Sequence, residues 1–509
     1  MKEFDSYVVV QAGGRGSRLR HHTWNKPKCL VSVRGKPLIY HLFDRFPKSK
    51  FIVIGDYAFD QLEAYLQLNP PPNQYQLLKA DSKGTASGIA QALALLPTNS
   101  SVLLTWSDLI IHEFPEISSE SSPIVFTTNS FTCRWSVSEN NKLQEVTSSD
   151  KGIPGIFYFP KVQDILNVPK HGEFVKWFSQ TAAKFITIDC SHLEELGDFE
   201  TIENDNERSG FSRFFNKVEV LEDRVIKSVV DHNYDDVHKK EVDWYKEAKS
   251  LGFLRIPKIF SYSPLEMERI KGLHAYQMKD LNEREKRAII VDGLDALIGL
   301  HGTASQAANP NQINAVYIQK TMDRVRSVSK LIPHFTRESM TINGKKCINP
   351  FTEKYKYLFN EISASLDTPL FNPIHGDPTF SNSIVDDKLR VWFIDPRGYF
   401  LDPGIMGDPW YDFAKLYYSA KGNYDAFNRK KFKLHIDEDT IEILMDESQF
   451  SKCVDDIFEE YFGAEIKRIK LIHGLLWLAL SGYAKDDIDS VIGSFYLGLY
   501  WLREGIESA

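Results

Sequence analysis

Residues 8–33 read VVVQAGGRGSRLRHHTWNKPKCLVSV, an apolar strand that runs into a glycine-rich loop with basic residues around it. Closely spaced glycines let backbone amides approach an anionic ligand. Arg18 and Lys28 add positive charge where a leaving phosphate group would need it. The stretch predicts a site for nucleotide phosphates; the alternative is a strand-to-helix turn with surface arginines in an unrelated α/β domain. The residues expected to contact the nucleotide here are Ala12, Gly13, Gly14 and Gly16.

Composition sets limits on size and partners. A chain of 509 residues has room for roughly three domains of about 150 residues each. Hydrophobic residues make up 42% and charged residues 26%, which is ordinary for a globular protein. The formal charge of -8, with no basic stripe, argues against binding of nucleic acid. We therefore expect small-molecule substrates as partners; the oligomeric state stays open.

Cysteine usage and hydropathy bear on the cellular compartment. None of the cysteines forms a C-x-x-C pair, which favours reduced thiols over disulfides or a zinc site. The start, MKEFDSY, lacks a basic stretch followed by an apolar core, and the apolar run at 471–480 is shorter than the ~20 residues of a membrane span. These features predict a cytoplasmic protein with no membrane partner. The cysteines are Cys29, Cys133, Cys190, Cys347 and Cys453.

Over residues 1–205, short apolar runs alternate with helical patterns. This alternation predicts an α/β domain with a doubly wound sheet. In such a sheet ligands bind at the carboxyl ends of the strands, which puts the glycine-rich loop at the site. Asp108 follows an apolar strand, so its carboxylate should stand where Mg²⁺ can bridge to phosphate oxygens; a simple cap at the strand end is the alternative. Strands are expected at 6–10, 51–54, 101–105, 123–127 and 156–159, and helices at 37–46 and 84–96.

The pattern G-G-x-G-x-R, a threonine and then P-K-x-L resembles the signature of the sugar-nucleotidyltransferase family. The resemblance implies a mixed sheet, catalytic roles for Arg18 and Lys28, and Asp108 and Asp198 as Mg²⁺ ligands. It also implies base and ribose contacts from Gly84 and Thr85, although these residues by themselves suit a helix N-cap equally well. The acceptor would lie near Arg134, Trp135 and Tyr158, where an ordinary strand pair is an equal explanation for the first two.

Two departures from the family bear on the nucleotide. A glutamine that often follows the central helix and loop in uridylyl- and thymidylyltransferases is missing near residues 79–83. The domain is also short and lacks a long C-terminal β-helix. In both respects it is similar to the small cytidylyltransferases, such as those that activate phosphocholine. CTP is therefore the favoured NTP.

A polar stretch at 206–212 predicts a linker before a second domain, with one lobe at 213–275 and a mostly helical lobe at 276–509. Strand-like runs at 216–221 and 224–230 place Lys227 on the second strand, and Glu241 follows in a helical stretch. A strand lysine paired with a helix glutamate holds the α- and β-phosphates of ATP in kinases. A solvated surface lysine is the alternative.

The motif HGDPTFSN at 375–382, followed by IDPRG at 394–398, resembles the paired motifs of the aminoglycoside-phosphotransferase and choline-kinase superfamily. The resemblance implies a bilobal α+β kinase fold and binding of ATP with Mg²⁺. Asp377 would accept the proton of the attacking hydroxyl, and Asn382 and Asp395 would hold Mg²⁺. Met267 would lie on the hinge strand that meets adenine, and Asp408 and Asp412 would support the loop.

The two resemblances together predict a bifunctional enzyme. The kinase would phosphorylate a small hydroxyl compound, and the first domain would couple that phosphate to an NTP for surface polysaccharide synthesis. Late aromatic residues could cage choline, giving a choline kinase and phosphocholine cytidylyltransferase, although core packing explains them as well. Arg397, if it faces the substrate, favours a sugar, polyol or acid. The two domains could instead act on unrelated substrates, or one inactive domain could bind a ligand and regulate its neighbour.

Overall fold

A computed structural model describes residues 6–117, 122–208, 216–230 and 235–508. The chain forms two compact units. The first comprises residues 1–208 with 486–489, and the second comprises 209–485 with 490–509. Each unit therefore has its own core and is described by itself.

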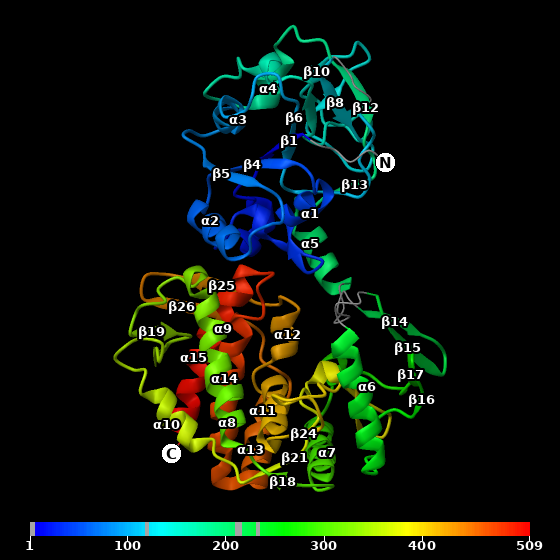
Figure 1. Ribbon diagram of the computed structural model, residues 1–509, viewed down its shortest axis with the longest axis vertical. Coiled ribbons are helices and arrows are strands. Elements are labelled where there is room, and N and C mark those ends of the chain that lie inside the picture. The colour runs from blue at the N-terminus through cyan, green and yellow to red at the C-terminus, as the bar shows by residue number, and fades with distance from the viewer. Residues whose placement is uncertain (1–5, 118–121, 209–215, 231–234, 509) are drawn as a thin grey trace. The chain divides into compact units, whose positions relative to one another are not determined.

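A seven-stranded mixed sheet forms the centre of the first unit (Figure 1), in the order β12-β8-β11-β6-β1-β4-β5. Strand β1 pairs in parallel with both β4 and β6, whereas β11 runs antiparallel to both of its neighbours. The strands predicted from apolar runs are all present, shifted by a residue or two at their ends. The sheet strands are β1 (Tyr7–Gln11), β4 (Lys50–Gly55), β5 (Tyr75–Lys79), β6 (Val102–Trp106), β8 (Ile124–Thr127), β11 (Phe157–Phe159) and β12 (Ile186–Asp189).

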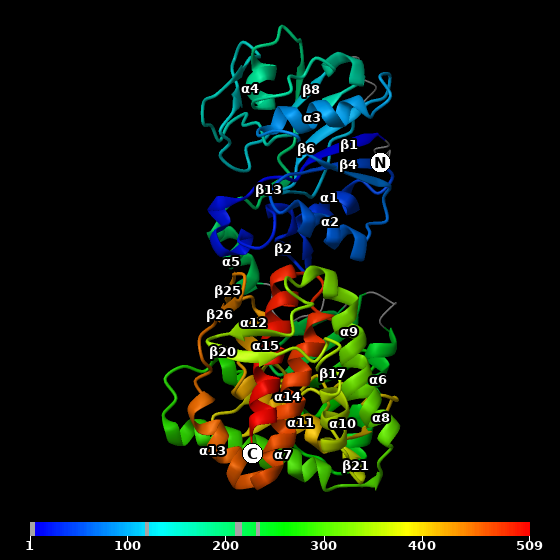
Figure 2. The same ribbon diagram turned by 90° about the vertical axis from the view of Figure 1, so that its left-hand side faces the viewer.

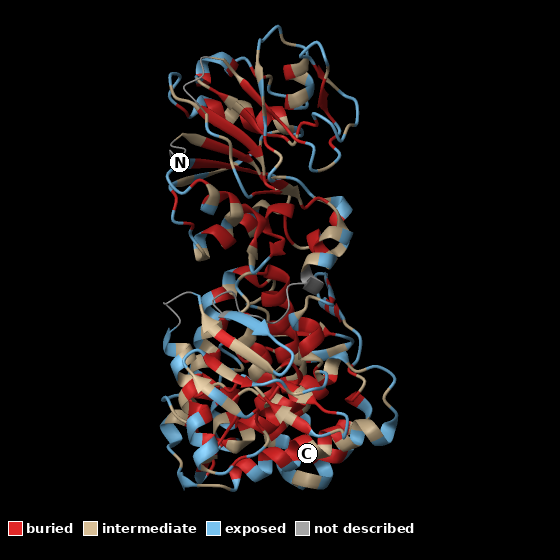
Figure 3. Cartoon of the chain, turned by 90° about the vertical axis from the view of Figure 1, so that its right-hand side faces the viewer, coloured by how far each residue is buried: buried red, intermediate tan, exposed pale blue. Residues whose placement is uncertain are grey.

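Helices cover both faces of this sheet because successive residues of a strand point to opposite faces. On one face Val9, Ile52 and Leu104 pack with helix α3 (Thr85–Ala94) and helix α4 (Phe174–Ser179). On the other, Phe51 meets Phe43 of helix α1 (Leu38–Arg45) edge-on at 4.8 Å between ring centroids. Buried residues follow the strands accordingly (Figure 3). Helix α2 is Phe59–Leu68.

A second, smaller core lies beside the carboxyl ends of the strands; we call it the loop core. It joins the 3-10 helix η1 (Ser17–Thr23), strand β7 (Leu109–Ile111), strand β13 (Leu193–Glu195) through the residue that follows it, and helix α5 (Phe199–Arg208). Burial of these side chains ties together segments that are far apart in the sequence. The loop core consists of Leu19, Val31, Val33, Leu38, Ile110, Leu196 and Ile202.

Helix α5 corrects the predicted linker. The expected linker begins at residue 206, but the helix continues through Arg208. Ile202 is fully buried in the loop core, and the Asp198 carboxylate accepts a hydrogen bond from the backbone of Thr201 in the first turn. A helix anchored and capped in this way extends through polar residues without a second apolar turn. Residues 209–212 of the linker and 213–215 of the predicted lobe lie outside the described residues.

The second unit begins with a four-stranded antiparallel sheet in the order β14-β15-β17-β16, next to helix α6 (Asp235–Ser250). The β14 and β15 hairpin matches the two strand-like runs of the sequence. Met267 is buried on β17, opposite Val225 of β15 and Ile259 of β16. The strands are β14 (Asn216–Val220), β15 (Arg224–Val229), β16 (Ile259–Tyr262) and β17 (Leu265–Glu268).

The remainder of this unit is mostly helical (Figure 2). Helix α14 packs against both α9 and α11. Two of the late aromatic residues, Trp477 on α14 and Tyr496 on α15, are buried among the helices of this unit, which agrees with core packing. The longer helices are α7 (Glu283–His301), α9 (Lys320–Val328), α10 (Leu358–Ser365), α11 (Pro409–Ala420), α13 (Ser451–Phe462), α14 (Ile466–Ser481) and α15 (Ile488–Glu507).

Short strands complete the second unit. A four-stranded sheet has the order β20-β19-β26-β25, and a hairpin of β22 (Ser383–Val385) and β23 (Val391–Phe393) lies between the two sequence motifs. The strands of the sheet are β19 (Ser339–Ile342), β20 (Lys345–Ile348), β25 (Lys433–Ile436) and β26 (Thr440–Leu444). Across the described part of the chain, no helix has both the length and the apolar character needed to cross a bilayer. All five cysteines are free thiols, as expected from their spacing.

Candidate active sites

The glycine-rich loop of the first unit is held by backbone hydrogen bonds. The N–H of Lys28 donates to the carbonyl oxygen of Gly14 over 3.3 Å, and the Thr23 hydroxyl donates to that of Gly16 over 3.1 Å. Gly16 has a φ of 65°, and a Cβ there would lie 3.0 Å from the Lys28 Cβ. The close approach and the left-handed backbone both require glycine. The loop thereby fixes the backbone position from which the Lys28 side chain extends.

The first residues of the loop are attached to the neighbouring strand. The N–H of Ala12 donates to the carbonyl oxygen of Ile54 over 2.9 Å, and the N–H of Tyr57 donates to that of Gly13 over 3.3 Å. A Cβ on Gly13 would lie 2.7 Å from the Asp56 Cβ. The loop therefore starts at the carboxyl edge of the sheet, where the parallel strands β1 and β4 end.

Charged side chains predicted for phosphate chemistry meet beside this loop. The Lys28 ammonium forms an ion pair with the Asp108 carboxylate, and only 10% and 16% of these two side chains are exposed. Arg18 reaches over from η1, with its Nη2 3.1 Å from Glu195 Oε1 and 2.9 Å from the position a Cβ on Gly197 would take. Lys28, Asp108 and Arg18 thus come from three separate segments.

Asp198 lies next to the same segments. The N–H of Leu196 donates to the carbonyl oxygen of Asp108 over 2.9 Å, which places the turn before α5 beside Asp108. Thr201 donates to both carboxylate oxygens of Asp198, from its N–H over 3.0 Å and from its hydroxyl over 2.8 Å. These hydrogen bonds, with the nearby charge of Arg18, lower the pKa of Asp198 below its usual value. Asp198 therefore carries a negative charge at neutral pH.

The loop core explains why these residues converge. Arg18 precedes Leu19, Asp108 lies two positions before Ile110, and Asp198 lies between Leu196 and Ile202. Burial of the apolar neighbours therefore positions the charged side chains. The carboxylates of Asp108 and Asp198 offer the oxygen ligands that Mg²⁺ prefers, so the donor set fits this metal.

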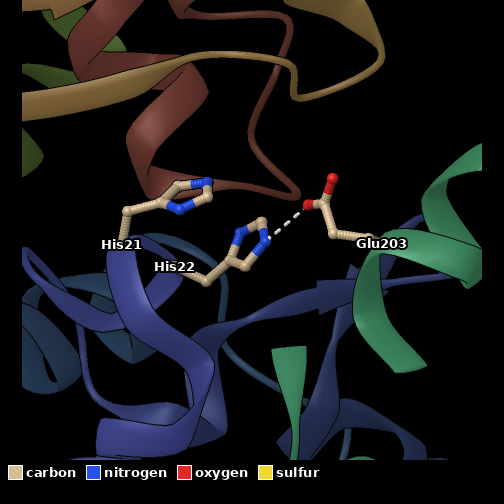
Figure 4. Close-up of side chains that lie close together, drawn as sticks. All are labelled: His21, His22 and Glu203. Atoms are coloured by element: carbon tan, nitrogen blue, oxygen red, sulfur yellow. Dashed lines mark hydrogen bonds and ion pairs between the residues drawn. The ribbon is translucent and has the colours of Figure 1, made fainter. Parts of the chain in front are cut away.

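His22 on η1 and Glu203 on α5 form a further tie between these segments. His22 Nε2 lies 2.8 Å from Glu203 Oε1, and His21 is close enough that the ligand atoms of the three residues fall within 4.8 Å of one another (Figure 4). The His22 side chain is 8% exposed. We interpret the pair as a hydrogen bond that holds α5 against η1, because it links the two elements that carry Asp198 and Arg18.

Gly84 and Thr85 open helix α3 near the end of β1. Gln11 donates from Nε2 to the carbonyl oxygen of Thr85 over 2.8 Å, and the Thr85 hydroxyl accepts from the N–H of Phe174 over 2.8 Å. A Cβ on Gly84 would lie 2.4 Å from the carbonyl oxygen of Gly172, and the φ of Gly84 is 99°. Gln11 was not predicted as a site residue, yet it connects the start of the loop to the α3 N-terminus.

The predicted acceptor residues are dispersed. Arg134 is exposed and forms ion pairs with Glu145 and Glu173. Trp135 is 8% exposed and packs in the main core of the sheet. Tyr158 is half-buried on β11 between β6 and β8. Of the three, Tyr158 lies on a sheet strand, and Trp135 faces the core.

In the second unit, Lys227 joins the sheet to the second sequence motif. Its Nζ lies 2.8 Å from Glu241 Oε2 on α6 and 2.9 Å from Asp395 Oδ1. Burial opposes the charge on the lysine, but Asp395 and Glu241 together raise its pKa above the ordinary value. The predicted pair of Lys227 and Glu241 is therefore formed, and Lys227 stays a cation.

Asp377 and Asn382 lie on one tight loop. Asn382 donates from Nδ2 to Asp377 Oδ2 over 3.0 Å and to the Asp377 carbonyl oxygen over 2.9 Å. Because the amide nitrogen of Asn382 faces Asp377, the amide oxygen of Asn382 faces away from it. The N–H of Ile394 donates to the Asn382 carbonyl oxygen over 2.9 Å, which brings Asp395 beside Asn382. The Asn382 amide oxygen and the Asp395 carboxylate are oxygen donors of the kind that Mg²⁺ takes, so this donor set fits it too.

Asp395 has a φ of 53°, in the left-handed region that non-glycine residues seldom adopt. Gly398, three residues later, has a φ of 69°, and a Cβ there would lie 2.4 Å from the carbonyl oxygen of Lys240 on α6. This close approach holds the segment after β23 against the helix that carries Glu241. Backbone strain of this kind is typical of functional loops.

Asp412 on α11 supports the loop that carries Asp377. Its carboxylate is fully buried and accepts hydrogen bonds from the N–H groups of His375 and Gly376, each over 2.7 Å. His301 Nε2 lies 3.1 Å from the same carboxylate. Burial lowers the pKa of His375, so its ring is neutral and its Nε2 donates to the carbonyl oxygen of Ile394. Asp412 thus has the supporting role expected from the sequence.

Replacing Asp412 by asparagine is expected to lower the free energy of unfolding by about 3 kcal/mol, because an amide nitrogen would face backbone donors in a dry site. Urea denaturation of the second-unit transition measures the change. The exposed Asp387, changed to asparagine, serves as the control. An Asp412→Asn protein as stable as this control would contradict the supporting role.

Basic side chains surround Asp377. Lys415 Nζ on α11 lies 2.9 Å from Asp377 Oδ1, and Arg397 donates from Nη1 to the hydroxyl of Tyr411 over 2.7 Å. On α9, Lys320 and Arg324 add two further basic side chains. Burial, together with the charges of Arg397, Arg324 and Lys415, lowers the pKa of Lys320 to about 6. Lys415, Lys320 and Arg324 were not predicted from the sequence, whereas Arg397 was.

Replacing Lys320 by methionine is expected to stabilise the unliganded protein. The folded-state pKa of Lys320 is about 6, and its usual value is 10.5. Between these pH values the unfolded chain binds more protons than the folded chain, so Lys320 lowers the free energy of unfolding. This loss of stability becomes smaller as the pH rises toward 10.5. Methionine removes that cost, which we place at about 1–3 kcal/mol at pH 7.

Thermal unfolding at pH 6.5 and at pH 9 measures this effect. The gain from Lys320→Met should be larger at the lower pH. The control is Lys330→Met at an exposed position just after the same helix. A gain in stability that does not depend on pH, or that the control shares, would mean that folding does not lower the pKa of Lys320.

Comparison with known proteins bears on the first unit. Residues 8–113 match the MobA-like NTP transferase domain. This range contains the glycine-rich loop, Lys28 and Asp108, and Asp198 lies beyond it. The match covers the predicted nucleotide-binding half of the first unit, and it agrees with the resemblance seen in the sequence.

Curated relatives are similar over the same region. The bifunctional protein GlmU of Methylobacillus flagellatus is 29% identical over 137 residues, which is 26% of this chain and 28% of that protein. N-acetylmuramate alpha-1-phosphate uridylyltransferase of Caulobacter vibrioides is 33% identical over 104 residues, 19% of this chain and 43% of that protein. The chain thus spans less than half the length of these relatives.

Solved structures are similar over the first unit as well. HddC from Yersinia pseudotuberculosis aligns with 40% of this chain and 99% of its own, at 19% identity and a TM-score of 0.34. CTP:phosphocholine cytidylyltransferase from Streptococcus pneumoniae aligns with 40% of this chain and 98% of its own, at 16% identity and a TM-score of 0.33.

Proposed function

We propose that the chain is a bifunctional enzyme whose second unit phosphorylates a small hydroxyl compound with ATP and whose first unit transfers a nucleotidyl group onto that phosphate. For the first unit, the supporting observation is the meeting of Arg18, Lys28, Asp108 and Asp198 beside a glycine-rich loop within and next to the NTP transferase match. For the second unit, it is the connection of Lys227 to both Glu241 and Asp395, close to Asp377.

In the nucleotidyl transfer, an oxygen of the acceptor phosphate attacks the α-phosphorus of the NTP. The bond from that phosphorus to the bridging oxygen of the β-phosphate breaks, and pyrophosphate leaves. Lys28 and Arg18 stabilise the charge that moves onto the leaving group. Mg²⁺, when held by Asp108 and Asp198, would supply further positive charge at the phosphates. Gly84 and Thr85 would contact the nucleoside, and CTP is the proposed NTP.

In the phosphorylation, the hydroxyl oxygen of the acceptor attacks the γ-phosphorus of ATP, and its proton passes to the Asp377 carboxylate. The bond from the γ-phosphorus to the bridging oxygen breaks and ADP leaves. Lys227, oriented by Glu241, would hold the α- and β-phosphates, and Met267 would lie against adenine. Asn382 orients Asp377 through the 3.0 Å hydrogen bond to Oδ2.

A pyrophosphate-release assay with the full-length protein tests the transfer. Each of the four NTPs is combined with phosphorylated sugars, polyols, hydroxy acids and amino alcohols, and ADP release from ATP is followed with the unphosphorylated compounds. We expect pyrophosphate from CTP with one class of acceptor, and ADP with the matching unphosphorylated compound. If the compound that yields ADP gives a phosphate ester that no NTP can use, the two activities are not consecutive.

A further inference from the structure

The side chains around Asp377 form a cluster of positive charge on one side of the proposed phosphorylation site. The acceptor cluster, as we call it, consists of Lys320, Arg324, Arg397 and Lys415. Arg397 follows the Asp395-Pro396 step, and its N–H donates to the carbonyl oxygen of His375 over 3.0 Å. A Cβ on Gly376 would lie 2.8 Å from the Arg397 Cβ. The cluster is therefore adjacent to the loop that carries Asp377.

Helix geometry directs the other members of the cluster to the same place. Lys320 and Arg324 are four residues apart on α9, so they share one face of that helix. On α11, Tyr411, Lys415 and Tyr418 share a face in the same way. Helices α9 and α11 both pack on α14. Arg397, Arg324 and Lys415 help to lower the pKa of Lys320 and Asp377 opposes them, so Lys320 lies in the neighbourhood of the Lys415–Asp377 ion pair.

The positive charge in this cluster is not balanced by carboxylates. Within the described part of the chain, Lys415 has an ion pair with Asp377, whereas Lys320, Arg324 and Arg397 have no carboxylate within ion-pair distance. Arg324 donates to the carbonyl oxygen of Ala479, and Arg397 to a tyrosine hydroxyl. Basic side chains that are partly buried without counterions are costly to hold in the charged form, and such arrangements are typical of sites that bind an anion.

The aromatic rings at this place are already in contact with cations of the protein. The Arg397 guanidinium carbon lies 4.2 Å from the centroid of the Tyr399 ring and 5.6 Å from that of Tyr411. Lys415 Nζ lies 5.3 Å from the centroid of Tyr418 and 6.0 Å from that of Tyr411. A quaternary amine would have to displace these contacts and approach like charges. The arrangement therefore disfavours choline as the acceptor.

We propose that the acceptor of the second unit carries an oxyanion, such as a carboxylate or a phosphate ester, which Lys320, Arg324 and Arg397 bind while its hydroxyl faces Asp377. The proposal rests on the phosphorylating function proposed above. A bidentate contact of Arg397 with the oxyanion would orient the compound as well as bind it. The same chemistry could instead serve the phosphates of ATP, and the experiment separates these two sources of negative charge.

The experiment titrates the full-length protein, loaded with a non-hydrolysable ATP analogue and Mg²⁺, with compounds matched in size by calorimetry. D-glycerate, glycerol 3-phosphate and gluconate are the anionic probes; glycerol and sorbitol are neutral, and choline is cationic. We expect at least one anionic probe to bind about 10-fold or more tightly than its neutral counterpart, as one lost charge-assisted contact implies. Equal or better binding of glycerol, sorbitol or choline would overturn the proposal, as would no binding of any anionic probe.

Two variants test whether Arg397 and Lys320 bind the oxyanion of the acceptor. Arg397→Gln and Lys320→Met should each weaken binding of the preferred anionic probe by about 10–100-fold, since each removes a contact to a charged group. Affinity for the ATP analogue should stay within about twofold of wild type. The controls are Arg326→Gln at an exposed position of α9 and Lys330→Met just beyond it. Loss of analogue affinity with unchanged probe affinity would mean that the cluster serves ATP, which overturns the proposal.

Activity separates this inference from the proposed function. ADP release is measured with each probe that binds. If an anionic probe binds through Arg397 and Lys320 but no hydroxy acid yields ADP, the phosphorylating function fails and the oxyanion site stands. If glycerol or sorbitol yields ADP and the anionic probes do not, the function stands and the oxyanion site fails.

Discussion

Replacing Asp377 by asparagine is expected to slow phosphorylation of the acceptor by about 10²–10⁴-fold, the usual loss when a general base is removed. Asparagine keeps the size of the side chain and can still pair with Asn382, but it cannot take the hydroxyl proton. The measurement is ADP release under saturating ATP, with kcat reduced and the KM for ATP unchanged. Nucleotidyl transfer onto a supplied phosphorylated acceptor should continue at the wild-type rate.

The Asp377 experiment has a matched control. Asp387 is exposed in the β22–β23 hairpin, and Asp387→Asn should leave both reactions unaffected. Because Lys415 would lose its ion pair with Asp377, the thermal stability of the variant has to be measured beside its activity. A folded Asp377→Asn protein that still releases ADP at the wild-type rate would remove Asp377 from the mechanism. Loss of both activities in a folded protein would contradict two separate sites.

Replacing Asp108 by asparagine is expected to have the opposite outcome: pyrophosphate release falls by about 10²–10³-fold while ADP release is unchanged. Asp108 forms an ion pair with Lys28 beside the glycine-rich loop, and with Asp198 it supplies the carboxylates of this site. An amide has no negative charge to offer to a metal ion or to orient Lys28.

A second variant guards against a folding defect at Asp108. Lys28→Met removes the other member of the ion pair and should cause a similar loss of pyrophosphate release. Asp150→Asn, at an exposed position of the same unit, is the control. If Asp108→Asn is folded and releases pyrophosphate at the wild-type rate, the proposed site at the end of β6 is wrong.

Much of the first unit could be predicted from local sequence. The apolar runs of β1, β4, β6, β8 and β11 are continuous, because central strands are covered on both faces. The edge strands β5 and β12 were not predicted, because each is half-buried and has no continuous apolar run. The predicted linker starts too early for a related reason: polar residues 203–208 have no apolar period, yet the cap and Ile202 hold them in α5.

The candidate sites also contain some residues that could be predicted from the sequence and others that could not. The proximity of residues within one motif, such as Asp377 and Asn382, could be expected from the resemblance of that motif to a known family, since five positions on a tight loop bring their side chains together. The proximity of Lys415, Lys320 and Arg324 could not be expected, because α9 and α11 are connected through the packing of each on α14. A basic pair with i,i+4 spacing on a helix is usually a solvated face, so nothing in the sequence marked Lys320 and Arg324 as members of a site.

By itself the sequence determined the glycine-rich loop, the alternation of strands and helices, and the two loop motifs of the second unit. These depend on local rules: glycine permits a left-handed backbone at Gly16, and apolar periodicity specifies a strand or a helix. Which charged side chains come together depends on the folded arrangement of the chain. The loop core brings Arg18 to the segment of Asp198, and the packing of α11 places Lys415 against Asp377. Burial of apolar surface does not depend on separation along the chain, so it can bring together residues that no sequence pattern links.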